Sequence, residues 1–430
     1  MKRALAALIF IAPYLVLAAS PRAESHARVR IVKAAAVKKP TVRSARARHA
    51  KRSDTRVAPD TRDGQAEARL IAIYKLIGQG SPREALSKAE ELVRDHPNFQ
   101  LAQLVYGDLL LGRTRAVRAF GDVPDSTAKT AGPVLAELRQ ESQQRLRALR
   151  ERPAAGMVPA QFLALPPPIK HAIAVDTSRS RLYLFENTAA GLKLVADYYI
   201  SVGKLGIEKS VEGDQRTPLG VYFITSNLNP KSLRDFYGSG ALPINYPNQL
   251  DIKRGKTGGG IWLHGTPPAQ FSRAPLSTDG CVALANPDLD RIIKTVAVGS
   301  TPVLIAQSLK WVAPQSLKAE ADSFDQALLG WQRAKSSGDM AQVMAWYTPD
   351  FTSFGKTLAE WAPALQGEVQ RLGRRELLMK DVSYMRWTDS TDTMVVTFGE
   401  LVKGAKTGQT KRQYWTRHGS QWKIFFEGVI

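Results

Sequence analysis

Two short stretches decide the fold and the chemistry of this chain: Gly260-Ile-Trp-Leu-His264-Gly265-Thr266 and Ser277-Thr-Asp-Gly-Cys281-Val-Ala-Leu284. The second stretch holds the one cysteine among 430 residues, and the first contains a histidine at the end of an apolar run. A thiol needs a base to become a good nucleophile, and a glycine beside it leaves backbone N–H groups accessible. We therefore predict an active site with Cys281 as nucleophile and His264 as base.

The alternatives to a catalytic thiol are weaker. A free cysteine is often a small core residue, but the polar, turn-forming stretch Thr278-Asp279-Gly280 precedes this one. A redox role lacks a second cysteine, and an internal disulfide is excluded. The sequence has no CxxC or HxxxH pattern, so neither a metal nor another cofactor is predicted. Acyl transfer, which needs a thiolate, a base and an oxyanion site, fits best.

The first residues have the pattern of an export signal. Lys2-Arg3 precede the apolar run Ala4–Ala19, and small residues follow it. We predict a signal peptide over residues 1–23, because the run is shorter than the ~20 residues that span a bilayer, and an uncleaved anchor is the alternative. Export argues against nucleic acid as a partner, despite the net charge of +21. The rest of the chain has no comparable apolar run, so the mature protein is expected to be soluble.

Residues 24–64 are predicted to form a basic, disordered linker. Between Arg22 and Arg56 there are 12 Lys/Arg and 2 acidic residues, a net charge of 12 − 2 = +10. Such a segment repels itself and has too few apolar residues to fold. Attraction to anionic envelope polymers or lipid headgroups and a purely solvated linker remain alternatives, so membrane contact stays open.

Residues 65–150 are predicted to be helical. Leu70, Ile73 and Ile77 fall at helical spacing, and Ser81 is placed to cap a helix that begins at Pro82. The order helix, short turn, helix, Asp95-His-Pro-Asn98 resembles a tetratricopeptide repeat. The resemblance implies a protein-interaction module for an envelope protein, and a helical spacer is the alternative.

A proline-rich linker over residues 151–168 is expected to be stiff and extended, because it contains Pro166-Pro-Pro168. Strand patterns then dominate residues 169–308, beginning with a hairpin of His171–Asp176 and Arg181–Glu186. The one predicted helix there covers Asp288–Val298, with Asn286 as its cap. This region is predicted to be a mostly-β domain with a cleft.

Residues 318–430 begin with helical patterns and end with alternating strands. Their order resembles the NTF2-like cone, a fold that can enclose a ligand pocket. The fold class is therefore multidomain α+β. We expect the tryptophans of this region to be core residues rather than a binding platform: Trp331, Trp346, Trp361, Trp387, Trp415 and Trp422.

The two opening stretches resemble the L,D-transpeptidase (YkuD-type) catalytic domain over about Ile169 to Ala306. Further matching pieces are Arg216-Thr-Pro-Leu-Gly-Val-Tyr222 and Gly258-Gly-Gly260. Two positions depart from the family pattern. Asp279 replaces the usual histidine before Gly-Cys, and Ala283 replaces the usual arginine or asparagine after the cysteine. A carboxylate near sulfur disfavours the thiolate, and Arg273 is expected to offset it.

The resemblance implies a role for each site residue. Cys281 is the nucleophile, His264 the general base and acid, Gly265 orients His264 through its carbonyl, and Gly280 offers an oxyanion N–H, as Cys281 itself also does. Asp279, Arg273, Tyr222 and Tyr246 are expected to contact the substrate.

The implied reaction is acyl transfer on peptidoglycan stem peptides that contain meso-diaminopimelate, in the periplasm, through a Cys281 thioester. The acceptor stays open between a stem peptide, a lipoprotein lysine, a D-amino acid and water. A murein hydrolase with the same acyl-enzyme and a non-catalytic envelope scaffold are the alternatives.

Overall fold

The computed structural model describes residues 64–373 and 375–430. The chain divides into Met1–Arg56 and Val57–Ile430, and the structure described below belongs to the second unit. The predicted signal peptide, and the predicted basic linker up to residue 63, lie outside the described residues. Within the described ranges, no helix combines the length and apolar character needed to cross a bilayer.

Four helices form the N-terminal segment: α1 (Gln65–Gly78), α2 (Pro82–Asp95), α3 (Gln100–Leu111) and α4 (Asp125–Arg150). The periodic apolar residues Leu70, Ala85 and Leu92 are buried between them, which confirms the helical prediction. Ser81 occupies the N-cap of α2 but makes no side-chain capping bond. The repeat resemblance and the partner it implies stay predictions.

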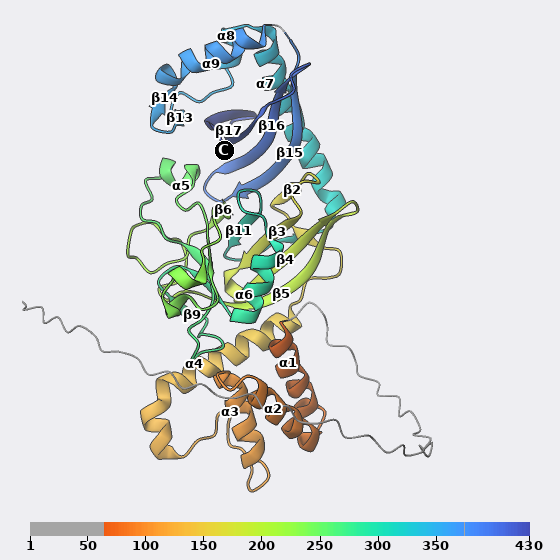
Figure 1. The fold of residues 1–430 in the computed structure, drawn as a ribbon. Helices are drawn as coiled ribbons and strands as arrows, with labels where there is room; N and C mark the ends of the chain where they lie inside the picture. Colours follow the sequence, from red (N-terminus) through yellow and green to blue (C-terminus); the bar gives the residue numbers. More distant parts are fainter. Residues whose placement is uncertain (1–63, 374) are drawn as a thin grey trace, which may run out of the picture. The chain divides into compact units, whose positions relative to one another are not determined.

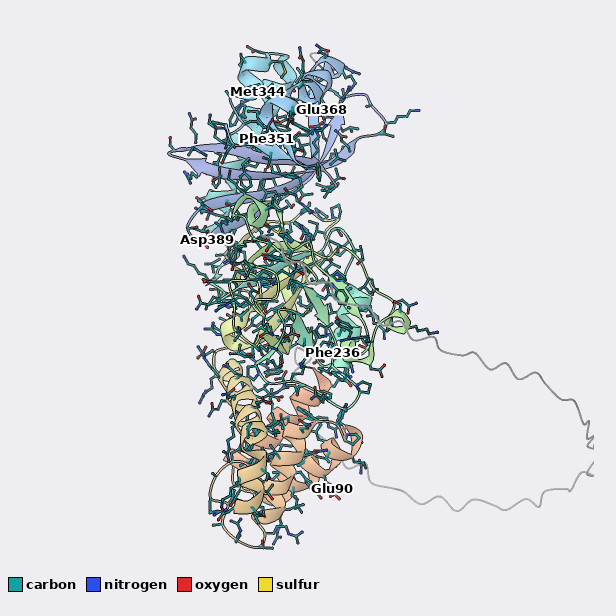
Figure 2. All side chains as sticks on the ribbon, turned by 90° about the vertical axis from the view of Figure 1, so that its left-hand side faces the viewer. Glu90, Phe236, Met344, Phe351, Glu368 and Asp389 are labelled. Carbon is teal, nitrogen blue, oxygen red and sulfur yellow. The ribbon has the colours of Figure 1, made fainter. Side chains whose placement is uncertain are left out.

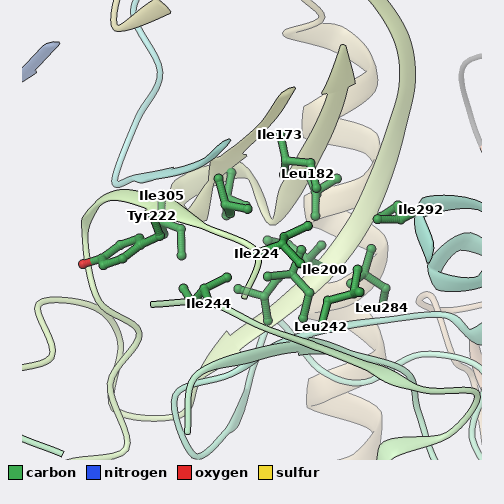
Figure 3. Packing of buried hydrophobic residues seen from close by; sticks show 14 of the residues in the cluster. Ile173, Leu182, Ile200, Tyr222, Ile224, Leu242, Ile244, Leu284, Ile292 and Ile305 are labelled. Atoms are coloured by element: carbon green, nitrogen blue, oxygen red, sulfur yellow. The ribbon is translucent and has the colours of Figure 1, made fainter. Parts of the chain in front are cut away.

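A mixed nine-stranded sheet forms the middle region of the chain. Along its long strands, successive side chains point to opposite faces, and both faces are apolar. One face contributes Ile173, Leu182 and Ile200 to a buried cluster, shown in Figure 3. Strand β9 (Leu276–Thr278) pairs with β5 outside the main path. The main path is β6 (Gly220–Phe223), β11 (Pro302–Ala306), β3 (His171–Asp176), β4 (Arg181–Thr188), β5 (Gly191–Gly203), β10 (Val282–Leu284), β8 (Trp262–His264) and β7 (Ala241–Pro243). Two α-helices, α5 (Gln249–Lys253) and α6 (Asn286–Thr295), belong to the same region.

The proline-rich stretch is not a simple linker, which corrects the prediction for residues 151–168. The prediction of an extended segment is also wrong at the proline run, where the Ile169 N–H donates to the Pro166 carbonyl at 3.0 Å and closes a turn. The stretch forms β1 (Val158–Pro159), paired with β12 (Trp311–Val312), and β2 (Phe162–Ala164). Strand β2 pairs with β15 of the C-terminal sheet. Phe162 and Leu163 are apolar and become buried in the core. Their strand also satisfies backbone hydrogen bonds by pairing with β15.

The C-terminal region packs helices against a curved antiparallel sheet of order β18-β17-β16-β15-β2. Figure 1 shows the long strands β15, β16 and β17 beside α7. The six tryptophans are buried or packed against this core, as predicted. The elements are α7 (Lys318–Ser337), α8 (Met340–Met344), β13 (Thr352–Ser353), β14 (Lys356–Thr357), α9 (Leu358–Leu372), β15 (Leu377–Thr388), β16 (Asp392–Val402), β17 (Gln409–His418) and β18 (Gln421–Val429).

Inside this C-terminal region lies a group of paired charges that we call the C-terminal ion cluster: Lys335, Glu368, Glu400, Lys411 and Glu427. Lys335 Nζ lies 2.8 Å from carboxylate oxygens of both Glu368 and Glu400. Lys411 Nζ lies 3.0 Å from Glu427 Oε1. The two lysines and Glu427 are almost fully buried, so ion pairs occupy interior space of this fold.

Candidate active site

The sheet brings the predicted nucleophile and base together on adjacent strands. Strand β10 runs parallel to β8, with Ala283 opposite His264. Cys281, directly before β10, lies beside Trp262, whose backbone N–H donates to Cys281 Sγ at 3.4 Å. Side chains alternate along a strand, so Trp262 and His264 share a face of β8. In the parallel register Ala283 lies opposite His264, and Cys281 is two residues before Ala283, so alternation along β10 predicts that the thiol and the imidazole face the same side of the sheet.

The His264 ring is fixed by the backbone and by aromatic rings. Its Nδ1 lies 2.7 Å from the Gly265 carbonyl oxygen. A carbonyl accepts only, so Nδ1 carries the proton and Nε2 keeps a lone pair. The rings of Tyr237 and Phe236 lie 5.2 Å and 5.8 Å from the imidazole, and Figure 2 labels Phe236. Gly265 thus makes the contact expected of an orienting residue, and the free Nε2 suits a base.

The candidate base and the candidate nucleophile are both neutral at neutral pH. Burial lowers the pKa of His264 to about 4, and the charge of Arg273 acts in the same direction. Burial likewise raises the pKa of the Cys281 thiol to about 11. The Trp262 N–H, Arg273 and Lys209 oppose this rise in the thiol pKa, whereas Asp279 adds to it. At neutral pH the resting pair is therefore thiol and imidazole rather than thiolate and imidazolium.

The turn before the thiol corrects one assignment. The N–H of Gly280, expected to stabilise an oxyanion, donates to Thr278 Oγ1 at 3.1 Å, because a threonine hydroxyl readily accepts from an N–H two residues later. This leaves the Cys281 N–H as the oxyanion candidate. Gly280 itself is required for space: its φ is +122° and a Cβ there would meet the Arg216 carbonyl at 2.7 Å.

The predicted contact of Asp279 with the substrate stays a prediction. Its carboxylate is exposed and pairs with Lys204, with 2.9 Å between Nζ and Oδ1. The cation in contact with it is therefore Lys204, which the sequence analysis did not identify. Arg273 interacts with Asp279 only through its charge. Its Nη2 donates to the Ser277 carbonyl at 2.8 Å, and its guanidinium lies over the Phe236 ring.

The two tyrosines expected to line the cleft are core residues, so this prediction is wrong. Tyr222 is fully buried, and its hydroxyl donates to Asp251 Oδ2 at 3.0 Å. Figure 3 shows this hydroxyl at the edge of the hydrophobic cluster, directed away from it. The hydroxyl of Tyr246 donates to the Thr257 carbonyl at 3.2 Å. Both phenols satisfy their polar atom inside the fold, a property that sequence spacing does not reveal.

Asn286 has a different role from the predicted helix cap. The N-cap of α6 is Ala285, and the Asn286 side chain instead bridges two loops. Its Oδ1 accepts from the N–H groups of Thr266 and Ser239 at 3.0 Å each, and its Nδ2 donates to the Thr266 carbonyl at 2.9 Å. A Cβ on Gly265 would lie 2.0 Å from Asn286 Oδ1. Asn286 therefore holds the turn that carries the His264 acceptor.

The helical segment holds the loop between the base and the nucleophile, which we call the active-site loop (residues 266–277). Phe271 stacks on Phe99 with 4.3 Å between centroids, and its N–H donates to the Asn98 carbonyl at 3.0 Å. Ser272 Oγ donates to Glu141 of α4 at 2.7 Å. No sequence motif marks these contacts, because they join segments about 130 to 170 residues apart.

The helical segment also carries an apolar groove of about 1240 Å³, formed in part by Tyr74, Leu86, Val105, Leu109, Phe120 and Leu146. The prediction that this segment binds an envelope protein stays a prediction. Among the described residues, no group of His, Cys, Asp and Glu side chains is arranged to hold a metal ion.

Comparisons with known proteins agree with this geometry. Residues 170–305 match the L,D-transpeptidase catalytic domain family (YkuD), and residues 323–428 match the Cds6 C-terminal NTF2-like domain. Both resemblances stated from the sequence are thereby confirmed. No curated protein matches the chain by sequence.

Two solved structures share the fold. Bd1075 from Bdellovibrio bacteriovorus is 23% identical, with a TM-score of 0.54, and the match covers 64% of this chain and 98% of that one. The helical cell shape determining protein Pgp2 from Campylobacter jejuni is 22% identical, with a TM-score of 0.50, over 67% of this chain and 99% of that one.

Proposed function

We propose that this chain is an exported, periplasmic cysteine L,D-transpeptidase that acts on peptidoglycan stem peptides. The observation that carries the proposal is the placement of Cys281 beside the strand of His264, with His264 Nδ1 held by the Gly265 carbonyl, inside a domain that matches this family. Pgp2 is named as a protein that determines helical cell shape. As part of the same proposal, we suggest that this chain also acts in determining cell shape.

The proposed reaction begins with proton transfer. His264 Nε2 takes the Cys281 proton while Sγ attacks the carbonyl carbon of the L-centre of diaminopimelate. The tetrahedral oxyanion is stabilised by the Cys281 N–H, a type of contact worth about 2.7–4 kcal/mol in other acyl-transfer enzymes. The C–N bond to D-alanine then breaks, and His264 gives its proton to the leaving amine. An acceptor amine attacks the thioester carbon and loses a proton to His264; the new C–N amide bond forms as the C–S bond breaks, and His264 returns the proton to Sγ to restore the thiol.

The neutral resting pair has a consequence for this mechanism. A thiol with a pKa of about 11 is almost wholly protonated at neutral pH, so thiolate forms as the substrate is attacked rather than beforehand. The carbonyl carbon of the bound substrate accepts the sulfur electron pair as the proton leaves Sγ. We therefore expect slow reaction with small thiol reagents and faster reaction with a correctly positioned acyl donor.

The test uses the purified full chain with disaccharide tetrapeptide, read by mass spectrometry. We expect D-alanine release and a Cys281-linked acyl-enzyme, both lost in Cys281→Ala. Absence of both in the wild type, while a known L,D-transpeptidase reacts in the same buffer, contradicts the proposal.

A non-catalytic scaffold is the second candidate, and it is supported by the raised thiol pKa together with the exposed Asp279. Modification of Cys281 by a carbapenem, lost in His264→Ala, argues against it. Incorporation of labelled water into free stem peptide, without amine-exchanged product, identifies a hydrolase instead.

A further inference from the structure

The helical segment and the catalytic domain bury apolar side chains in one common cluster, which we call the shared core. It contains Leu70 and Phe99 of the helices together with Phe271 and Ala285 of the catalytic domain. Phe271 belongs to the active-site loop, and only 6% of it is exposed. Ala285 is the N-cap of α6 and directly precedes Asn286, whose side chain bridges two loops of the candidate site. The helices therefore bury two residues that adjoin the reacting groups along the chain.

A network of buried polar groups joins the same two parts of the chain. Glu141 Oε1 accepts from Ser272 Oγ at 2.7 Å and from Arg145 Nη2 at 2.7 Å. The Arg145 guanidinium lies 4.0 Å from the centre of the Tyr199 ring, and the Tyr199 hydroxyl donates to the Arg273 carbonyl at 2.9 Å. Glu141 and Arg145 are each 2% exposed, so little water competes for these bonds. Helix α4 thus holds two successive residues of the active-site loop.

The first half of the active-site loop connects Phe271 to the base. The Thr266 hydroxyl donates to the Gln270 carbonyl at 2.9 Å and also lies 3.3 Å from the Phe271 carbonyl oxygen. Thr266 directly follows Gly265, whose carbonyl oxygen lies 2.7 Å from His264 Nδ1. A shift of Phe271 is therefore transmitted to the acceptor that orients the imidazole.

The second half of the loop connects Ser272 to the nucleophile. The next residue, Arg273, donates from Nη2 to the Ser277 carbonyl at 2.8 Å. The hydroxyl of Thr278 then donates to the Cys281 carbonyl at 2.7 Å. The order of the turn before the thiol therefore depends on where Ser272 and Arg273 are held.

We infer that the helical segment is a positioning element of the active site, in which Phe99 and Glu141 hold the active-site loop. Through that loop they keep His264 Nε2 and Cys281 Sγ aligned with each other and with the bound donor. Loops are the more mobile parts of a fold, and a misplacement of reacting groups by about 1 Å can cost about 10²-fold in rate. The inference rests on the proposed function and gives the segment a role other than a spacer or a protein-interaction module.

The experiment measures D-alanine release from disaccharide tetrapeptide by the full chain, with kcat and KM determined separately. Phe99→Ala is expected to lower kcat by up to about 10²-fold with little change in KM, because the reacting pair loses its alignment. Ser272→Ala removes one hydrogen bond and is expected to lower kcat by about 2- to 10-fold. Ser272→Thr keeps the hydroxyl and Phe99→Leu keeps much of the apolar contact, so both are expected to recover most of the rate.

Two controls separate positioning from general damage. Leu135→Ala truncates a buried side chain of α4 outside the shared core, and it is expected to lower stability without changing kcat. When Phe99→Ala and Phe271→Ala are combined, the double variant is expected to lose about as much rate as the larger single variant, because both remove the same contact. Wild-type kcat in both Phe99→Ala and Ser272→Ala, or an equal loss in Leu135→Ala, overturns the inference while the proposed function stands.

If the wild type releases no D-alanine, the proposed function fails, and the positioning role is tested by amide hydrogen exchange. Phe99→Ala is expected to speed exchange at residues 264–266 and 277–281, whereas Leu135→Ala is expected to leave it unchanged there. Equal exchange of the wild type and Phe99→Ala at these residues overturns the inference as well.

Discussion

Two buried sets of titratable groups in this chain behave in opposite ways. In the catalytic domain, no charged side chain of residues 64–373 or 375–430 is in direct contact with His264 or Cys281, and burial favours the neutral form of both. In the C-terminal ion cluster, Lys411 lies against Glu427, Glu368 and Glu400. Its pKa is raised, and that of Glu427 falls to about 2 despite burial. Direct ion pairing allows buried side chains such as Lys411 and Glu427 to stay charged. Without such a partner, Cys281 and His264 stay neutral, so the thiol retains a proton that the imidazole can accept.

The same contrast extends to the junction with the helical segment. Glu67 lies 2.8 Å from Arg145 and 2.9 Å from Arg181, and its pKa is lowered to about 2. Asp288 is also buried near these charges but has a pKa raised to about 7 by burial, with Glu67 adding to the rise. Placement relative to the arginines, rather than burial alone, decides which carboxyl is charged at neutral pH.

The largest expected effect comes from removing the reactive pair. His264→Ala is expected to reduce Cys281 acylation by a carbapenem by about 10²–10⁴-fold, because the thiol loses its proton acceptor. Cys281→Ser is expected to abolish the thioester. His418→Ala, which changes an exposed histidine at the end of β17, serves as the control. An unchanged acylation rate in His264→Ala would contradict the role of His264 as the proton acceptor for Cys281.

Next in size is the loss of a paired charge. Glu427→Gln is expected to destabilise the fold by about 3–5 kcal/mol, since Lys411 loses its most deeply buried carboxylate partner. Urea unfolding measures the free energy, and carbapenem acylation of the folded fraction is expected to be unchanged. Glu376→Gln, which removes an exposed ion pair with Lys403, is expected to change little. Equal stability of the two variants contradicts the contrast drawn above.

Acid stability follows from the same carboxylates. Glu67 and Glu427 have folded pKa values of about 2, below the ordinary value of 4.5. The unfolded state therefore binds more protons between these values, and the stability they provide is present above pH 4.5 and lost as the pH falls toward 2. Urea midpoints between pH 6 and pH 3 test this. In Glu427→Gln the drop over that window is expected to be smaller.

The alkylation profile of Cys281 tests the neutral resting pair. Burial raises the thiol pKa to about 11, so the iodoacetamide rate is expected to rise about tenfold per pH unit from 7 to 9. An ordinary thiol, with a pKa of ~8.5, levels off near the top of that range. Mass spectrometry of the labelled protein gives the rate. A rate independent of pH indicates a resting thiolate–imidazolium pair instead.

The smallest effect is expected at Asp279. Asp279→Asn removes a carboxylate that raises the thiol pKa, so alkylation is expected to increase by a few fold at most, because this carboxylate is exposed and paired with Lys204. Lys204→Met is expected to shift the rate in the opposite direction. A large loss of carbapenem acylation in Asp279→Asn instead assigns Asp279 a direct role in the reaction.

Much of the fold was predictable because it rests on local patterns. The helices around Leu70 and Leu92 follow from apolar spacing, and the hairpin at His171 follows from two alternating runs around a polar turn. Short strands escaped detection, among them β7 and β10, because three residues carry no periodicity. The strand role of Phe162 also escaped, because it depends on a partner strand more than 200 residues later.

The sequence by itself determined the predicted chemistry: one thiol, one histidine at a strand end and a glycine before the thiol indicate a candidate nucleophile, a candidate base and a turn. Only the tertiary structure decided the surroundings. It placed Tyr222 in the core, committed the Gly280 N–H to Thr278, and set α4 against the active-site loop. Reactive residue types and turn chemistry are properties of adjacent residues, whereas burial and hydrogen-bond partners depend on which distant segments pack together.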